Sequence, residues 1–323
     1  AAAANYTIAR DNEADSQKTR AEPSFSVKKS RPSEASQRTT RFNQRLPSNA
    51  IVLVQQRLQA AGFDPGKSDG QLGDKTYQAA RQALLARAQQ LQQLPRDWPT
   101  WGGERHAVAY LQLLCLDQQI DTGVVDGYWG PQTTYAVEAL DYFYQNGQLP
   151  APWRDNEPEP SNLIVPAQAQ HWPRQKDMVS FYGQPGTHQV SIALPYPHRL
   201  AWDVDKVVNK FSCHEKVHDS LERVLIKVLA HYGKDKIKAL RLDLWGGCLN
   251  VRKMRGGSSW SMHSWGTAID YDPERNQLKW GKDRASFAKS EYAAWWQFWE
   301  EEGWLSLGRT RNYDWMHVQA ARL

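Results

Sequence analysis

The 323-residue sequence contains little cysteine and no long apolar run. Its three cysteines, Cys115, Cys213 and Cys248, are odd in number and far apart, so neither a disulfide framework nor a cysteine-rich zinc site fits them. This usage favours a chain that folds in a reducing compartment. No segment approaches the roughly 18 apolar residues of a transmembrane helix, and residues 1–20 lack the apolar stretch of a signal peptide. We therefore expect synthesis in the cytoplasm without a signal peptide, and no membrane partner.

Charge and aromatic content narrow the classes of partner only weakly. The net charge of +5 slightly favours polyanionic partners, but it does not by itself indicate nucleic acid, which we do not expect as a partner. Tryptophan is abundant, with 15 residues, nine of them between Trp245 and Trp315. Tryptophan is common both in cores and on surfaces that stack on sugars or peptides, so both roles stay open. The length predicts about two domains.

Residues 1–48 differ in composition from the rest of the chain. They contain nine Lys or Arg and five Asp or Glu among many small polar residues, without apolar periodicity. Such a segment cannot bury enough apolar surface to fold alone. We interpret it as a basic arm that is either a flexible, solvated tail or a segment that docks on a partner.

A repeat with a period of 57 residues begins near Val52, and seven of nine compared positions are identical in its two copies, which indicates a duplication. The compared positions are Gln55, Leu58, Phe63, Gly66, Asp69, Gly70, Gly73, Thr76 and Ala79, and then Gln112, Cys115, Ile120, Gly123, Asp126, Gly127, Gly130, Thr133 and Ala136. Each copy predicts a helix, a tight turn with positive φ at Gly70 and Gly73, and a second helix. A long Gln-rich helix is expected over residues 81–105, between the copies.

The segments "DGQLGDKT" and "DGYWGPQT" resemble the signature of the peptidoglycan-binding domain family, a small three-helix module. The resemblance covers residues 50–147 and implies an all-helical domain that binds bacterial peptidoglycan. A structural helical bundle without affinity for the wall is the alternative. Five prolines in residues 150–166 predict a semi-rigid linker. The expected organisation is an arm (1–48), a duplicated helical domain (49–150), a linker (151–166) and a second domain (167–323).

Two histidine-containing segments of the second domain are candidates for a metal site. The first matches the pattern HExxH, which on a helix places His214 and His218 on one face, with Glu215 able to activate a water. The apolar spacing predicts a helix over 213–231. The extended pattern HExxHxxGxxH fails at its glycine and at its third histidine, so we expect no metal here.

The second candidate joins "SMHSWGTAIDYD" to the later segment "DWMHV". His263, Asp270 and His317 are ligand types that can form a zinc site with an open fourth position for water. Gly266 permits the turn that brings His263 back toward Asp270. The small side chain of Ala268 leaves room beside a metal.

Alternating apolar residues predict two strands at this site, over 267–271 and 315–319. A regular strand would place Asp314 and His317 on opposite faces. The chain must therefore bend near Asp314 if this carboxylate is to move a proton beside the metal, and "RTRNYD" has the composition of a loop.

The pattern SxHxxGxAxD followed by DxxH is similar to the zinc peptidases that include D-alanyl-D-alanine carboxypeptidases and L-alanoyl-D-glutamate endopeptidases of bacteria and phages. The similarity extends over most of residues 170–323. It implies that Zn²⁺ is bound by His263, Asp270 and His317, and that Asp314 is the general acid/base.

The same resemblance implies an arginine that stabilises the oxyanion, for which Arg252 fits best and Arg255 is the other candidate. We expect an α+β zinc peptidase domain, in which helices over 213–231 and 286–302 pack on a small antiparallel sheet that carries the zinc. With the all-α domain before it, this makes a modular peptidoglycan hydrolase that cleaves an amide bond in the stem peptide or cross-bridge.

The absence of a secretion signal fits a phage lysin that acts at the bacterial cell wall after release by lysis machinery, or one that is carried in a virion. The alternative is a virion or baseplate structural protein with a wall-degrading or inactive peptidase domain, in which residues 1–48 dock on other virion proteins. A pure wall-binding module is a third, weaker possibility. The sequence does not indicate which amide bond is cleaved.

Overall fold

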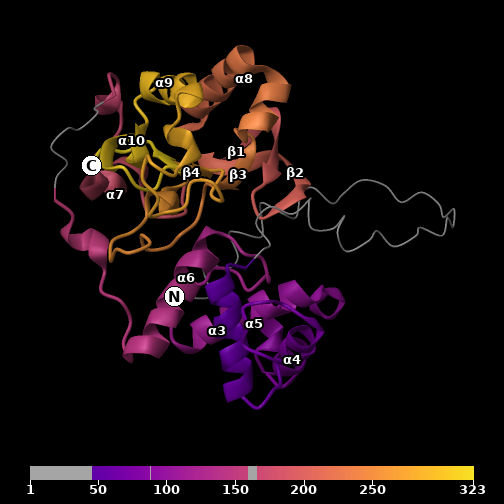
Figure 1. Cartoon of the computed structure of the whole chain (residues 1–323). Helices are drawn as coiled ribbons and strands as arrows, with labels where there is room; N and C mark the ends of the chain where they lie inside the picture. Colours follow the sequence, from indigo (N-terminus) through magenta and orange to yellow (C-terminus); the bar gives the residue numbers. More distant parts are fainter. Residues whose placement is uncertain (1–45, 88, 159–165) are drawn as a thin grey trace, which may run out of the picture. The chain divides into compact units, whose positions relative to one another are not determined.

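The computed structural model describes residues 46–87, 89–158 and 166–323, and the contacts divide these residues into two units between Pro152 and Trp153 (Figure 1). We call residues 46–152 the repeat unit and the described residues from 153 onward the sheet unit. The predicted arm, residues 1–48, lies outside the described residues except for its last three. Leu46 is buried and Ser48 begins the first helix, so these last residues belong to the repeat unit. Within the described ranges, no helix has the length and apolar character needed to cross a membrane.

The repeat unit is built from four α-helices and two short 3-10 helices, namely α3 (Ser48–Ala60), α4 (Asp74–Leu85), η2 (Leu91–Gln93), η3 (Trp98–Thr100), α5 (Gly103–Asp117) and α6 (Pro131–Asn146). The described part of this unit contains no β-strand. The predicted long helix over 81–105 is wrong, because α4 ends at Leu85. Pro95 and Pro99 interrupt any further helix, since proline lacks the backbone donor of an interior turn.

The duplication is visible in the hydrogen bonds of the repeat unit. In the first copy, the Gln55 side-chain amide bonds to Asp69, Gly70, Gln71 and Thr76. In the second copy, the Gln112 amide bonds to the equivalent Asp126, Gly127, Tyr128 and Thr133. Gly70 and Gly127 have φ values of +73° and +72°. The predicted positive φ at Gly73 is wrong, because this residue has a φ of −123° and caps α4 in an extended conformation.

The sheet unit contains a six-stranded sheet with the order β2-β1-β3-β4-β6-β5. Its strands are β1 (Gln189–Leu200), β2 (Asp203–His214), β3 (Leu244–Gly247), β4 (Ala268–Tyr271), β5 (Leu305–Ser306) and β6 (His317–Gln319). The prediction of a mixed α and β fold is confirmed. The prediction of an antiparallel sheet is wrong for one pair of strands, because β3 pairs with β1 in parallel. A helix, rather than a hairpin, connects β2 to β3, and such a connection permits parallel pairing.

Four α-helices and six 3-10 helices complete this unit, namely η4 (Trp153–Asn156), η5 (Ala169–His171), η6 (Gln175–Asp177), α7 (Met178–Tyr182), α8 (His218–Leu240), η7 (Met262–Trp265), η8 (Ser286–Ala288), η9 (Ser290–Tyr292), α9 (Ala293–Glu301) and α10 (Leu307–Arg311). Helix α8 packs on β1 and α9 (Figure 1). The helix predicted over 213–231 begins only at His218, because Cys213 and His214 end β2. The helix predicted over 286–302 is α-helical only in α9, after two 3-10 turns.

Most tryptophans of the sheet unit belong to its core. The buried ones between residues 245 and 315 are Trp245, Trp265, Trp295, Trp296, Trp299, Trp304 and Trp315. Trp260 differs from them, because 39% of its surface is exposed. The open question about tryptophan is therefore answered mainly in favour of packing, with Trp260 as the surface exception.

Residues 153–158, which we call the strap, also pack on the sheet unit. The linker expected over 151–166 is therefore part of a folded unit in its first half, and residues 159–165 lie outside the described residues.

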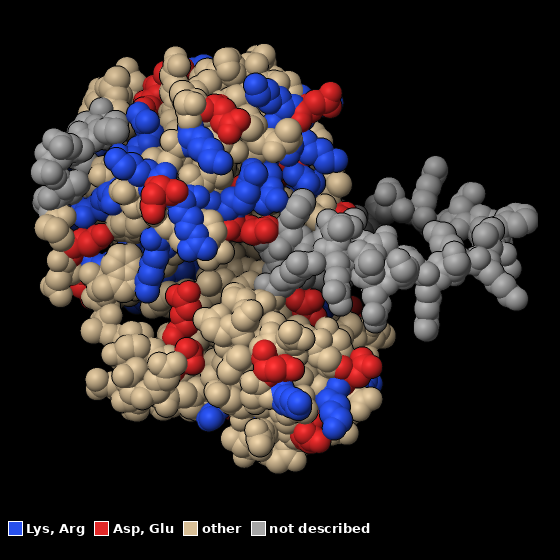
Figure 2. All heavy atoms as spheres, in the orientation of Figure 1, with Lys and Arg blue, Asp and Glu red and all other residues tan. Residues whose placement is uncertain are grey.

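The two units also differ in their content of charged residues. Lys and Arg side chains are numerous on the face of the sheet unit drawn in Figure 2. Residues 49–150 contain 7 basic and 10 acidic residues, whereas residues 151–323 contain 24 and 20.

Candidate metal centre

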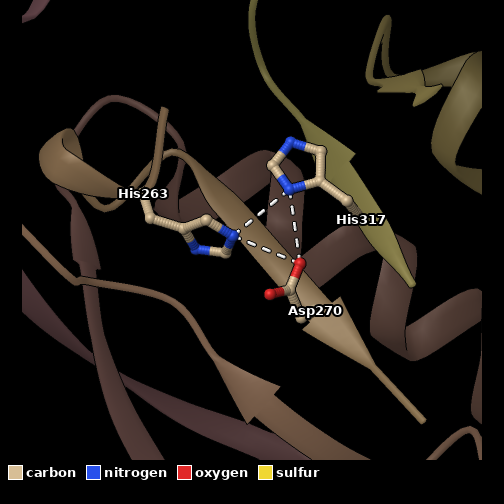
Figure 3. A group of neighbouring side chains, drawn as sticks. All are labelled: His263, Asp270 and His317. Carbon is tan, nitrogen blue, oxygen red and sulfur yellow. Dashed lines mark hydrogen bonds and ion pairs between the residues drawn. The ribbon is translucent and has the colours of Figure 1, made fainter. Parts of the chain in front are cut away.

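The three predicted ligands converge in the sheet unit (Figure 3). Asp270 on β4 and His317 on β6 are directly paired residues of neighbouring strands, and His263 approaches from η7. His263 Nε2 lies 3.2 Å from Asp270 Oδ1 and 3.2 Å from His317 Nδ1. His317 Nδ1 lies 3.3 Å from Asp270 Oδ1. All three side chains are buried, and together they form a cluster that could bind a metal ion.

The turn that presents His263 is defined by its flanking residues. The Ser261 hydroxyl accepts a hydrogen bond from the His263 N–H and caps η7. Gly266 ends the turn with a φ of +67°, as the sequence predicted for the residue that returns the chain. This positive φ favours glycine, and a Cβ at Gly266 would also force the end of the Gln189 side chain, 2.3 Å away, to move.

The tautomer of His263 follows from its second ring nitrogen. Nδ1 lies 2.8 Å from the backbone oxygen of Cys248, which can only accept a hydrogen bond. Nδ1 therefore carries the proton, and Nε2 of the neutral ring presents a lone pair to the cluster. Burial is the main reason why the pKa of His263 is lowered, which keeps the ring neutral, although Asp270 opposes this shift.

The tautomer of His317 is defined in the same way by Gln319, two residues further along β6. The Gln319 amide nitrogen donates to the backbone oxygen of Ala321 and to Gln175, so its oxygen faces His317 Nε2 at 2.9 Å. His317 Nε2 therefore carries a proton, and Nδ1 is the ring nitrogen that faces the cluster. Outer hydrogen bonds of this kind orient histidines that bind metals.

Asp270 completes a set of three acceptors. Burial is the largest influence on the pKa of Asp270 and would raise it, but His263 and His317 together hold this pKa well below its ordinary value. The carboxylate is therefore ionised. When neither inner ring nitrogen carries a proton, three lone pairs face one another, and this arrangement suits a bound cation.

Asp314 lies beside this cluster, in the bend that the sequence required. Its φ is +55°, and its backbone oxygen accepts a hydrogen bond from the His317 N–H. The side chain is 5% exposed and lines a pocket together with His263 and His317. Its Oδ1 atom has no hydrogen-bond partner within the described part of the chain. A buried carboxylate oxygen in this state is available to a water or a substrate.

Both predicted arginines line the same pocket, and both are buried. The Arg255 guanidinium lies 3.9 Å from Asp270 Oδ2. The backbone of Arg252 bonds to Ser264, next to the ligand His263. The structure therefore brings together all six residues that the sequence singled out.

The rejected HExxH segment does not form the helical face that its pattern needs. His214 is the last residue of β2, and His218 is the first residue of α8. His214 Nε2 donates to the backbone oxygen of Tyr182 at 2.7 Å, while its Nδ1 accepts from the Lys216 N–H. Both ring nitrogens are thus engaged inside the fold.

Sequence reasoning missed two residues of the site. Gln319 orients His317 from two positions away on the same strand, so the two-residue period of a strand could have indicated it. Arg154 in the strap lines the pocket, but nothing in its local sequence points there. No protein-family model, curated protein or solved structure matches this chain.

Proposed function

We propose that this chain is a zinc-dependent peptidoglycan hydrolase that cleaves an amide bond of the wall stem peptide or cross-bridge. The observation that carries the proposal is the convergence of three buried lone pairs, from His263, Asp270 and His317, beside the unpartnered carboxylate oxygen of Asp314. The sequence resemblance to wall-acting zinc peptidases supports the substrate class.

The spacing of the ligand atoms supports zinc. Zinc binds nitrogen and oxygen ligands at about 2.0–2.1 Å in a tetrahedron, whose edges are then about 3.3 Å. The three separations in the cluster are 3.2, 3.2 and 3.3 Å. Three protein ligands also leave one corner of the tetrahedron open, which is typical of catalytic rather than structural zinc sites.

When bound, zinc supplies a Lewis acid that polarises the amide carbonyl and lowers the pKa of a water. Asp314 Oδ1, which lacks a partner in the described chain, takes a proton from the attacking water and returns it to the leaving amine. Arg255 or Arg252 stabilises the negative charge that develops on the carbonyl oxygen, because a guanidinium is always charged. Hydrogen bonds donated by the two histidine rings to the Cys248 backbone oxygen and the Gln319 side-chain oxygen hold the rings in place.

We propose that the repeat unit binds the wall and so raises the local concentration of the enzyme on an insoluble substrate. Its 7 basic and 10 acidic residues in 49–150 make attraction to anionic wall polymers an unsuitable basis for that binding. We therefore expect binding that depends little on salt. Wall binding joined to hydrolysis is the arrangement of a lysin, and we propose a phage lysin or a virion-borne one.

Turnover on purified sacculi tests the proposed function. The full-length chain with zinc should release new amino groups, and mass spectrometry of the muropeptides should identify the cleaved bond. A chelator should stop the release, and added zinc should restore it. If the zinc-loaded chain releases no more amine than its Asp314→Asn variant, the proposed function is wrong.

A further inference from the structure

The strap, residues 153–158, joins the two loops that carry the catalytic candidates. On one side, the Arg154 N–H donates to the backbone oxygen of Gly256 at 2.7 Å, and Asp155 accepts from the Ser258 N–H at 2.8 Å. Gly256 has no room for a side chain, because a Cβ there would lie 2.3 Å from the Trp153 indole nitrogen. The strap is therefore fitted closely to the loop that follows Arg255.

On its other side, the strap contacts the loop that ends at Asp314. Trp153 and Tyr313 meet edge to face, with ring centroids 5.4 Å apart. The Tyr313 hydroxyl donates to Glu157 at 2.7 Å, and Arg311 lies 3.4 Å from the same carboxylate. The strap thus connects the arginine loop to the residue next to the proposed general base.

These contacts place the Arg154 side chain at a junction. Arg154 lines the pocket that contains Asp314 and His317, and it also lines a larger groove whose walls include Lys176, Lys253 and the exposed Trp260. The guanidinium donates to the backbone oxygen of Arg255 at 3.3 Å and lies 5.3 Å from the centre of the Tyr313 ring.

The charge of Arg154 is not neutralised by the protein around it. Within the described ranges, no carboxylate lies within 4.0 Å of its guanidinium, which contacts a backbone oxygen and aromatic rings. Asp155, the acidic residue on the same groove, instead accepts a main-chain hydrogen bond from Ser258. A positioned guanidinium without an acidic partner is suited to bind a carboxylate or phosphate of a ligand.

We propose that Arg154 binds a carboxylate of the substrate where the groove enters the metal pocket, so that the enzyme prefers peptides with a free carboxylate close to the cleaved amide. The inference rests on the proposed function for its substrate class, an acidic peptide. It assigns to the strap a part in specificity, in addition to its contacts with the two catalytic loops.

Equilibrium binding to the full-length, zinc-loaded Asp314→Asn chain tests this inference, because binding is then read without turnover. The probes are a synthetic wall stem peptide with free carboxylates and the same peptide with its carboxylates amidated. We expect the free acid to bind more tightly. Adding Arg154→Gln should weaken binding of the free acid about 10- to 100-fold, as for the loss of a hydrogen bond between charged groups, and should leave the amide unchanged.

Two further variants control the experiment. Arg154→Lys keeps the charge but not the planar fork, so it should restore part of the preference. Arg284→Gln removes an arginine that also lies over a ring, Trp280, but lines neither pocket, so it should change nothing. Equal binding of both peptides by the parent chain, or an equal loss of both in Arg154→Gln, would overturn the role of Arg154. Absence of turnover by the wild type would instead refute the proposed function and leave this ratio readable.

Discussion

The Gln112 network of the repeat unit and the metal centre of the sheet unit are both buried clusters of polar atoms, but they are satisfied differently. The Gln112 amide donates to Asp126 and Thr133 and accepts from the Gly127 N–H, so each donor faces an acceptor. In the candidate metal centre, His263 donates a hydrogen bond to the Cys248 backbone oxygen, and His317 donates one to the Gln319 side chain. When their inner nitrogens carry no proton, the two rings and Asp270 present only lone pairs to one another, and a bound cation completes the cluster.

This difference separates a structural cluster from a ligand-binding one. A network in which donors and acceptors match is complete within the chain, and it stabilises the turn between two helices. A cluster of acceptors is incomplete without a cation, and its cost must be offset by the ligand it binds. The Asp314 Oδ1 atom likewise has no hydrogen-bond partner within the described chain, and we expect the substrate or a water to supply one. Four experiments examine this comparison, from the largest expected effect to the smallest.

The largest effect is expected from removal of a metal ligand. The wild type should bind one zinc per chain, whereas His263→Gln should bind none and lose hydrolysis, because two ligands do not hold the ion. His218→Gln should keep its zinc, since His218 bonds to Asp219 at the start of α8. Metal analysis of the purified chains checks this. Loss of zinc in His218→Gln with retention in His263→Gln would show that the assignment of the site is wrong.

Replacement of Asp314, the proposed general base, should separate the effect on turnover from the effect on metal binding. Asp314→Asn should keep the zinc content of the wild type, because Asp314 is not among the three converging ligands. Its turnover on sacculi should fall about 10²- to 10⁴-fold, the usual contribution of general acid–base catalysis. Parallel metal analysis and kinetics are needed. An Asp314→Asn chain that loses its zinc would make Asp314 a ligand rather than a base.

A smaller effect is expected when a residue that hydrogen-bonds to a candidate ligand is replaced. Gln319→Leu removes the acceptor that fixes the His317 tautomer, so zinc affinity should fall about 10- to 100-fold. Competition with a chromophoric chelator measures the change. Gln297→Leu is the matched control, because Gln297 bonds only to Glu301 on the exposed face of α9. Equal zinc affinities for the two variants would show that Gln319 does not support the metal site.

The smallest effect should appear in the repeat unit. Gln112→Ala leaves the buried Gly127 N–H without its acceptor, which should cost about 1–3 kcal/mol of unfolding free energy. Zinc affinity should not change. Gln82→Ala, on the exposed face of α4, is the control and should have little effect. Denaturant unfolding in the presence of zinc measures the stability of both variants. Loss of zinc in Gln112→Ala would contradict the distinction between the two clusters.

Patterns over short distances allowed much to be predicted from the sequence. The 57-residue repeat identified Gln55 and Gln112, because the same turn needs the same partners in each copy. The candidate ligands could be chosen from their residue types and motif spacing, and the structure places two of them, Asp270 and His317, opposite each other on β4 and β6. The bend at Asp314 followed from the two-residue period of a strand, since a regular strand would have pointed its carboxylate away.

Only the tertiary structure decided the features that depend on distant contacts. The HExxH segment has helical spacing, yet pairing of β2 with β1 extends the strand to His214 and delays the helix to His218. The five prolines of residues 150–166 predicted a linker, but packing on Gly256 and Tyr313 makes the strap part of the candidate site. Local propensity contributes small free energies, which strand pairing and burial outweigh. The sequence by itself therefore singled out the residues that converge in the cluster, while the tertiary structure decided which outer partner each histidine ring bonds to and which arginine lies at the edge of the pocket.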